Sequence, residues 1–142
     1  MAADDTTVCS TPAWLDWSDQ IGQIPPVWAY SPHYVRLTRL FQELDIGRAD
    51  GRYGKMMRQL AKADVLILDE WGLAVLTDQH RRDLLEILDD RYNIRATIIT
   101  SQLPIAHWHE AVGDPTLADA ILDRVVHNAY KINLSGKTMR GN

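Results

Sequence analysis

Helix-like and strand-like segments alternate along the chain from Tyr34 onward. Two apolar runs without polar alternation, residues 65–68 and 96–100, predict strands that helices cover on both faces. Shorter strands are predicted at residues 34–37 and 131–134, and helices at residues 39–49, 52–63, 106–112 and 116–128 and in the segment after Thr77. This alternation predicts an α/β fold with a mostly parallel sheet.

Two of the predicted helices carry start signals and an apolar face. Thr77 can cap one helix, and Thr116 with Asp119 can form a capping box for another. The apolar side chains at helical spacing are Leu84, Leu85, Leu88 and Tyr92 in the first helix and Leu117, Ile121, Leu122 and Val125 in the second. These faces are expected to pack against the sheet.

The first 31 residues differ from the remainder. They contain three of the five tryptophans and no lysine or arginine, and they show no sustained period of either kind. The chain therefore divides into an unassigned segment, residues 1–31, and one regular domain, residues 32–142.

Composition limits the possible classes of protein. A chain of 142 residues is long enough for one domain with a core, and a net charge of −4 argues against a positively coated protein but permits a local basic face. No apolar run approaches the roughly 18 residues of a membrane-spanning helix. The absence of a leader-like start and the single cysteine, Cys9, lead us to expect a cytoplasmic protein without membrane contact.

Polar side chains follow both central strands. Asp69 and Glu70 come directly after residues 65–68, and Thr100 and Ser101 end the next strand. Parallel strands bring their carboxyl ends to one edge, where ligands bind, so these residues are expected to lie together. From this pattern, the acids could serve a metal or a phosphate, or could simply end a strand.

Four segments in this order resemble one family: "LILDEWG", "TIITSQLP", "WHEAVGDPT" and "ADAILDRVVHNAY". They are similar to the IstB-like ATP-binding proteins of insertion sequences, which are relatives of the DnaC helicase loaders within the AAA+ ATPases. The resemblance extends from about Tyr34 to the end of the chain. It implies the parallel sheet with flanking helices of a P-loop nucleoside triphosphatase, with ATP and Mg²⁺ as cofactors.

The same resemblance assigns roles to the four polar residues. Asp69 takes the place of the Walker B aspartate, which holds Mg²⁺ through water, and Glu70 that of the catalytic glutamate, which polarises water. Thr100 and Ser101 fall at the sensor position on the following strand.

Two arginines are implicated in the same way. Arg124 lies where such ATPases carry an arginine that reaches the nucleotide of a neighbouring subunit, and Arg140 resembles a sensor contact that helps bind the nucleotide. From the residues themselves, Arg124 could equally be a solvated helix residue in a surface ion pair, and Arg140 part of the chain's tail.

The sequence contains no phosphate-binding loop of the form G-x-x-x-x-G-K-[ST]. Gly136-Lys137-Thr138 has lysine where the first glycine should stand, and Gly54-Lys55 has alanine there. In the fold that the family implies, the strand before this loop lies between the strands predicted at residues 96–100 and 131–134. The domain is therefore expected to be incomplete and poorly stable unless N-terminal residues fill the gap.

Two further groups of residues in the sequence could carry chemistry, a histidine pair and a basic cluster. His107 and His109 are two residues apart, so on a helix they cannot converge on one metal ion. A basic cluster could line a DNA-facing surface or be a solvated helix face; its members are Arg48, Arg52, Lys55, Arg58 and Lys62.

The resemblance implies an ATP-binding accessory subunit of DNA transposition that assists an insertion-sequence transposase. Its expected partners are that transposase, double-stranded DNA and further copies of the chain in an AAA+ oligomer. Without a phosphate loop, this chain is expected to be a truncated or inactive copy. The alternatives are a DnaC-like helicase-loader ATPase and a non-catalytic remnant that only interacts with other subunits.

Overall fold

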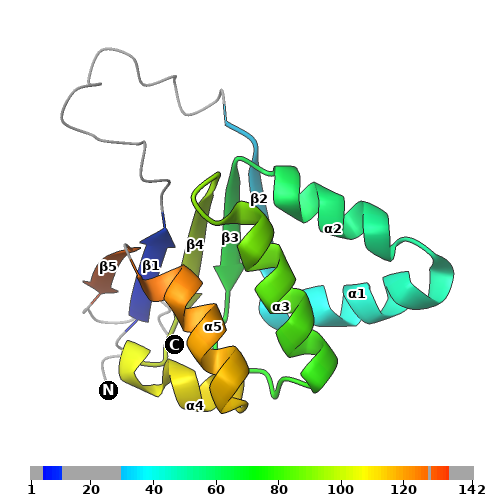
Figure 1. The fold of residues 1–142 in the computed structure, drawn as a ribbon. Helices are drawn as coiled ribbons and strands as arrows, with labels where there is room; N and C mark the ends of the chain where they lie inside the picture. Colours follow the sequence, from blue (N-terminus) through cyan, green and yellow to red (C-terminus); the bar gives the residue numbers. More distant parts are fainter. Residues whose placement is uncertain (1–4, 11–29, 128, 135–142) are drawn as a thin grey trace, which may run out of the picture.

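One sheet forms the centre of the fold (Figure 1). The computed structural model describes residues 5–10, 30–127 and 129–134. Five strands pair in the order β2-β3-β4-β1-β5, with bounds β1 Asp5–Ser10, β2 Pro32–Arg36, β3 Val65–Asp69, β4 Ala96–Ser101 and β5 Ala129–Leu134. β2, β3 and β4 are parallel, and β5 runs in their direction because β1 is antiparallel to both β4 and β5. The predicted α/β fold with a mostly parallel sheet is confirmed.

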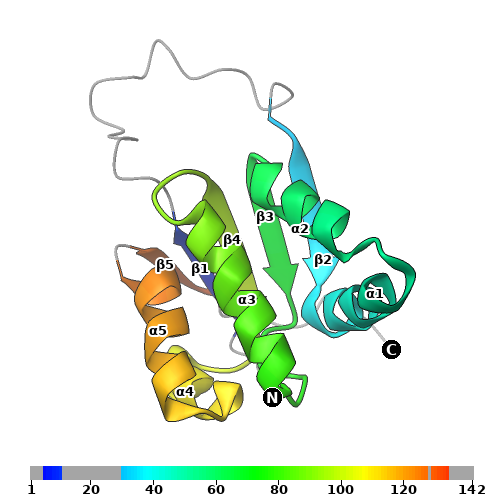
Figure 2. The same cartoon turned by 45° about the vertical axis from the view of Figure 1, so that its right-hand side comes forward.

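The helices pack on one face of this sheet (Figures 1 and 2). They are α1 (Leu37–Asp50), α2 (Tyr53–Lys62), α3 (Asp78–Arg91), the short 3₁₀-helix η2 (Ile105–His107), α4 (Trp108–Val112) and α5 (Pro115–Val126). In the described part of the chain, no helix is both long and apolar enough to span a membrane.

The burial of β3 follows this one-sided arrangement. Leu66 and Leu68 face the helices and are fully buried, whereas Val65 and Ile67 on the other face are half-buried. Coverage of the central strands by helices on both faces, which their apolar sequence predicts, is therefore wrong for the described residues. The core lies between the covered face and the helices, where Trp108, Leu44 and Ile121 are also buried.

The helix starts agree with the sequence in one case and differ in the other. The Thr77 side chain accepts a hydrogen bond from the His80 N–H at 3.2 Å, so the predicted cap of α3 is confirmed. α5 is capped by Asp114, whose side chain accepts from the Leu117 N–H at 2.9 Å. The predicted capping box of Thr116 and Asp119 is wrong, because the helix begins earlier, at a proline whose fixed φ suits the first helical position.

The inward face of α3 also differs from its apolar pattern. Leu84 and Leu88 are buried as predicted and Leu85 is half-buried, but Tyr92 is 36% exposed because the helix ends one residue before it. Arg91, in the last turn, is buried instead with 1% of its surface exposed. The single helix predicted at residues 106–112 is a 3₁₀ turn followed by a short α-helix.

The position between β4 and β5 is filled by β1. This strand pairs with both neighbours from Thr6, opposite Ser101 and Asn133, to Ser10, opposite Thr97 and Ala129. The N-terminal residues that complete the sheet are therefore 5–10, while the tryptophans of residues 1–31 lie outside the described residues. Because β5 pairs with no other described strand, β1 joins it to the sheet.

Candidate functional site

Asp69 lies at the carboxyl end of β3, where side chains from both neighbouring strands bind it. Thr100 at the end of β4 donates a hydrogen bond from its hydroxyl to Asp69 Oδ1, and the Glu70 N–H donates to the same oxygen at 2.9 Å. Tyr34 from β2 donates its phenolic hydroxyl to Oδ2. The carboxylate is thus fixed by donors on β2, on β4 and directly after β3.

These donors also determine the charge of Asp69. Partial burial by itself raises the pKa of the Asp69 carboxyl, because a low dielectric disfavours the charged form. The hydrogen bonds from Thr100, Tyr34 and the Glu70 N–H, with the positive charge of Arg36 nearby, outweigh burial and hold the pKa of Asp69 below its usual value. Asp69 is therefore an anion at neutral pH.

Glu70 is placed by an uncommon backbone conformation. Its φ of 65° lies in the left-handed region, which costs a non-glycine residue about 1–2 kcal/mol. The following N–H, of Trp71, bonds to the Thr100 carbonyl at 3.1 Å and so resumes pairing with β4. The Glu70 side chain is 32% exposed, and its Oε1 lies 3.8 Å from Nε of Arg36. A solvent-accessible carboxylate therefore follows the anchored one.

Ser101 does not share the position of its neighbour. Its hydroxyl donates to the Trp71 carbonyl at 2.7 Å and accepts from the Leu103 N–H at 2.9 Å, and the residue is 4% exposed. Successive strand residues face opposite sides of a sheet, so Thr100 points to Asp69 while Ser101 points into the helical layer. Ser101 therefore anchors the loops after β3 and β4.

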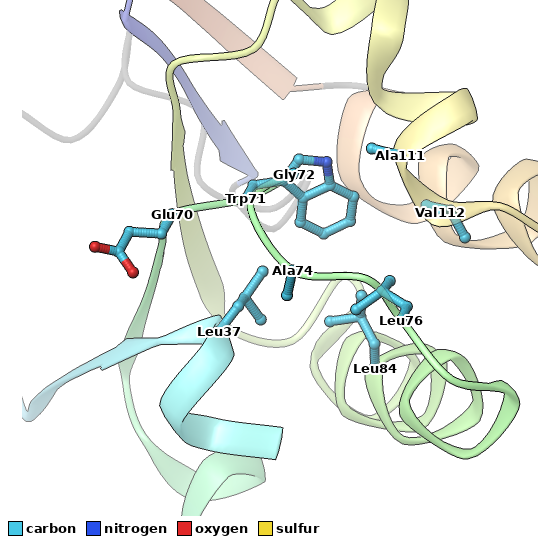
Figure 3. Close-up of a pocket in the computed structure, with 9 residues that line it drawn as sticks. All are labelled: Leu37, Glu70, Trp71, Gly72, Ala74, Leu76, Leu84, Ala111 and Val112. Atoms are coloured by element: carbon cyan, nitrogen blue, oxygen red, sulfur yellow. The ribbon is translucent and has the colours of Figure 1, made fainter. Parts of the chain in front are cut away.

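The loop after β3 borders an apolar hollow, which is also lined by Leu37, Leu76 and Val112 among others (Figure 3). Figure 3 shows the Trp71 ring at the hollow and the Glu70 side chain pointing away from it. Its empty volume is about 270 Å³, open solvent included, which is below the range of about 300–1,000 Å³ for small-molecule sites. The hollow is therefore too small to hold a nucleotide.

Arg124 lies far from the acid pair. Its guanidinium donates to Asp89 on α3 and to the Ala120 carbonyl at 2.9 Å. Asp89 lies in the last turn of α3, shortly before β4 begins, whereas Asp69 ends β3, so the two sites are at opposite ends of the strands (Figure 1). Arg124 cannot reach a ligand at Asp69 of its own chain. Arg140 lies outside the described residues.

The basic cluster separates into paired and free residues. Arg48 donates to the buried carboxylate of Asp83 and stacks on Tyr53, with 4.4 Å between its guanidinium carbon and the ring centre. Arg52 pairs with Asp50 at 2.7 Å. The remaining side chains project from the exposed side of α2 and form no ion pair with any described carboxylate; they are Lys55, Arg58 and Lys62.

The acid pair fits a hard divalent cation. Mg²⁺ prefers oxygen ligands and binds through one or two carboxylates, with waters and phosphates completing its coordination. Asp69 and Glu70 supply two adjacent carboxylates, with the Thr100 hydroxyl beside them. The described residues contain no group of three or more His, Cys, Asp and Glu side chains that could ligate a metal. Two carboxylates and one hydroxyl therefore suit an ion that keeps most of its water ligands better than an ion enclosed by protein ligands.

Sequence reasoning did not find Tyr34 and Arg36 as members of the site. Both lie on β2, two residues apart, and contact Asp69 and Glu70 respectively. Strand alternation from Tyr34 would have placed them on one face, but the strand order that brings this face beside Asp69 is a tertiary feature.

Comparisons with known proteins agree with this arrangement. Residues 28–142 match the family described as IstB-like ATP binding protein. An insertion sequence ATP-binding protein of Sinorhizobium fredii, y4pL, is 59% identical over 109 residues, which are 77% of this chain and 44% of the relative. The ATP-binding protein of insertion sequence IS21 from Pseudomonas aeruginosa is 35% identical over 107 residues, 75% of this chain and 40% of the relative.

The chain thus spans less than half the length of these relatives. The match includes β2 to β5 and both acids, whereas β1 precedes it. Since the family match covers most of the chain, the protein belongs to the IstB-like ATP-binding proteins.

Proposed function

We propose that this chain carries the metal-binding and water-activating acids of an ATP-dependent accessory protein of DNA transposition, which assists the transposase of an insertion sequence. The observation that carries the proposal is the anchored Asp69 carboxylate, held by Thr100 and Tyr34 with Glu70 exposed beside it. The names of the relatives, which specify ATP binding and insertion sequences, support the substrate and the context.

Each residue has a role that its geometry permits. Asp69 and the water around it would hold Mg²⁺, which when bound neutralises charge on the phosphate oxygens of ATP. Glu70, which reaches solvent, would accept a hydrogen bond from the attacking water and orient it. Thr100 holds Asp69 in the nucleotide-free chain and would turn its single hydroxyl proton to the terminal phosphate when ATP is bound, while Ser101 keeps the surrounding loops in place.

Arg124 would act between subunits. Because it lies at the end of the strands away from Asp69, its proposed target is the nucleotide of a neighbouring copy in an oligomer. A planar guanidinium suits this role, since it stays charged and can bind two phosphate oxygens. The hydrogen bond from Arg124 to Asp89 would then break when the oligomer assembles.

The direction in which β1 runs favours a second candidate function, a non-catalytic subunit that interacts with other copies. A phosphate-binding loop follows a strand that runs toward the carboxyl edge of the sheet. β1 runs in the opposite direction, from Asp5 beside the carboxyl edge to Ser10. In this structure, the position between β4 and β5 therefore delivers no such loop beside Thr100.

Nucleotide binding separates the two candidates. The purified chain is titrated with a fluorescent ATP analogue and Mg²⁺, together with Asp69→Ala and with Asp90→Ala, which changes an exposed aspartate of α3. The first candidate predicts saturable binding that Asp69→Ala loses and Asp90→Ala keeps. Absence of binding by the unmodified chain would favour the non-catalytic subunit.

Double-stranded DNA is the proposed partner of the exposed side of α2. Three basic side chains project there without an acidic partner: Lys55, Arg58 and Lys62. For each phosphate contact that is lost, the slope of log K against log salt becomes shallower by about 0.9. Replacing all three by glutamine should weaken DNA binding and lower the slope of log K against log salt by roughly 2–3. Arg82→Gln, on the exposed part of α3, is the control, and an unchanged slope in the triple variant would contradict the assignment.

A further inference from the structure

Tyr34 and Thr100 bind the two oxygens of Asp69 from opposite sides. Thr100 on β4 donates its hydrogen bond to Oδ1. Tyr34 on β2, which is 35 residues from Asp69 in the sequence, donates to Oδ2. Tyr34 is opposite Ile67 in the strand register, so its ring extends along the sheet by two residues to reach Asp69. Each carboxylate oxygen is consequently occupied by a hydroxyl donor.

The two donors differ in how easily they can leave. Thr100 lies on a central strand and is half-buried, and β-branched side chains have restricted χ1 rotation. Tyr34 is 56% exposed and lies on β2, an edge of the described sheet. Exposed side chains change rotamer within nanoseconds, so the Tyr34 hydroxyl can leave Oδ2 without unpacking the core.

A hydrated cation at Asp69 needs a free lone pair on this carboxylate, for direct coordination or for a hydrogen bond from a bound water. Oδ1 already accepts from Thr100 and from the Glu70 N–H. Oδ2 accepts from Tyr34 and is the oxygen whose donor is mobile. Oδ2 keeps one free lone pair beside the phenol, so Tyr34 and the cation would share this oxygen, and the phenol's hydrogen bond lowers its strength as a ligand.

We propose that Tyr34 is a positioning residue that binds Asp69 Oδ2 when no metal is bound and, while it does so, weakens the uptake of hydrated Mg²⁺ by Asp69. This inference rests on the proposed metal role of Asp69. It adds that an aromatic hydroxyl of β2 weakens resting metal binding and keeps the acid oriented toward the edge of the sheet.

The test measures Mn²⁺, as a probe for Mg²⁺, from the electron paramagnetic resonance signal of the free ion. Tyr34→Phe removes the hydroxyl and keeps the ring, so its Mn²⁺ affinity should rise about three- to tenfold, the equivalent of one ordinary hydrogen bond. Tyr130→Phe is the matched control, because Tyr130 is a similarly exposed tyrosine, 54% exposed on β5, and should leave the affinity unchanged. Thermal unfolding of Tyr130→Phe should match that of the unmodified chain, whereas Tyr34→Phe should unfold at a slightly lower temperature because Asp69 loses one hydrogen bond.

The outcomes separate this inference from the proposed function. Equal affinity in Tyr34→Phe and the unmodified chain, with loss of binding in Asp69→Ala, overturns the inference and leaves the metal role of Asp69 intact. Binding that Asp69→Ala does not change, or no Mn²⁺ binding by the unmodified chain, overturns both. A lower unfolding temperature in Tyr34→Phe without a change in Mn²⁺ affinity would assign the hydroxyl a structural role instead and also overturn the inference.

Discussion

Replacing Arg91 should produce the largest loss of stability of any single change considered for this protein. Arg91 is 1% exposed. Its guanidinium donates to the carbonyls of Leu60 at 2.7 Å, Ala63 at 2.6 Å and Ala96 at 2.6 Å, and to the Thr97 hydroxyl at 3.0 Å. Burial lowers its pKa to about 10, so it remains charged at neutral pH. It therefore joins the end of α2 to the beginning of β4.

The magnitude follows from the acceptors left behind. Arg91→Met keeps a long helix-forming side chain but removes every donor. Leaving one buried acceptor unpaired costs about 1–3 kcal/mol, so removing the donor from three carbonyls should cost at least about 3 kcal/mol in total. For a chain of this size, that loss corresponds to a fall in melting temperature of roughly 10–20 °C.

Urea unfolding followed by tryptophan fluorescence measures this effect, because Trp71 and Trp108 are buried with ring centres 5.1 Å apart. Arg82→Met is the matched control, since Arg82 is exposed on the same helix and should change stability by less than about 0.5 kcal/mol. A loss in Arg91→Met within 1 kcal/mol of the control would refute the reasoning and show that water replaces the guanidinium at these carbonyls.

Three further changes have defined outcomes. Gly72→Ala should destabilise by more than about 1–2 kcal/mol, because φ is 88° and the added Cβ would lie 2.9 Å from Leu103 Cδ2. Asp114→Ala should lower the free energy of unfolding by about 1 kcal/mol, since the Leu117 N–H loses its cap. The lowered pKa of Asp69 stabilises the fold fully above about pH 4, and this contribution is lost as pH falls through the lower folded pKa, so Asp69→Asn should flatten the acid limb of the stability curve.

Matched variants test each reason. Gly51 also has a φ of 86° but open space around its Cβ position, so Gly51→Ala should cost less than the change at position 72. Thr116→Ala should have little effect, because Thr116 does not cap α5. Asp90→Asn, at an exposed position on α3, is the control for Asp69→Asn. Equal effects within any of these pairs would contradict the corresponding explanation.

Local patterns determined most of the elements from sequence. β3 and β4 lie within one residue of their apolar runs, and Thr77 caps α3 as its position indicates. Adjacency of Asp69 and Thr100 was also predictable, because parallel strands end at the same edge. The strands and the cap depend on side-chain periodicity and on bonds between residues close in sequence, whereas the contact of Asp69 with Thr100 needs only that two neighbouring strands run parallel.

Contacts between distant segments required the tertiary structure. The position of β1 depends on two neighbouring strands about 90 and 125 residues further along the chain, and nothing in its short sequence specifies them or its antiparallel direction. Likewise, the buried carbonyls that bind Arg91 belong to segments about 30 residues before it and 5 after it. Local periodicity places such a residue on a helix face, but only the packing of α2, α3 and β4 decides what it meets there.

The acid site shows the same division. The sequence by itself determined that an apolar strand ends in two carboxylates, because strand length and alternation are local properties. Only the tertiary structure decided that Tyr34 reaches Asp69, that Arg36 lies near Glu70, and that Ser101 turns away into the helical layer. The physical reason is that strand order and register bring together residues that no local pattern relates.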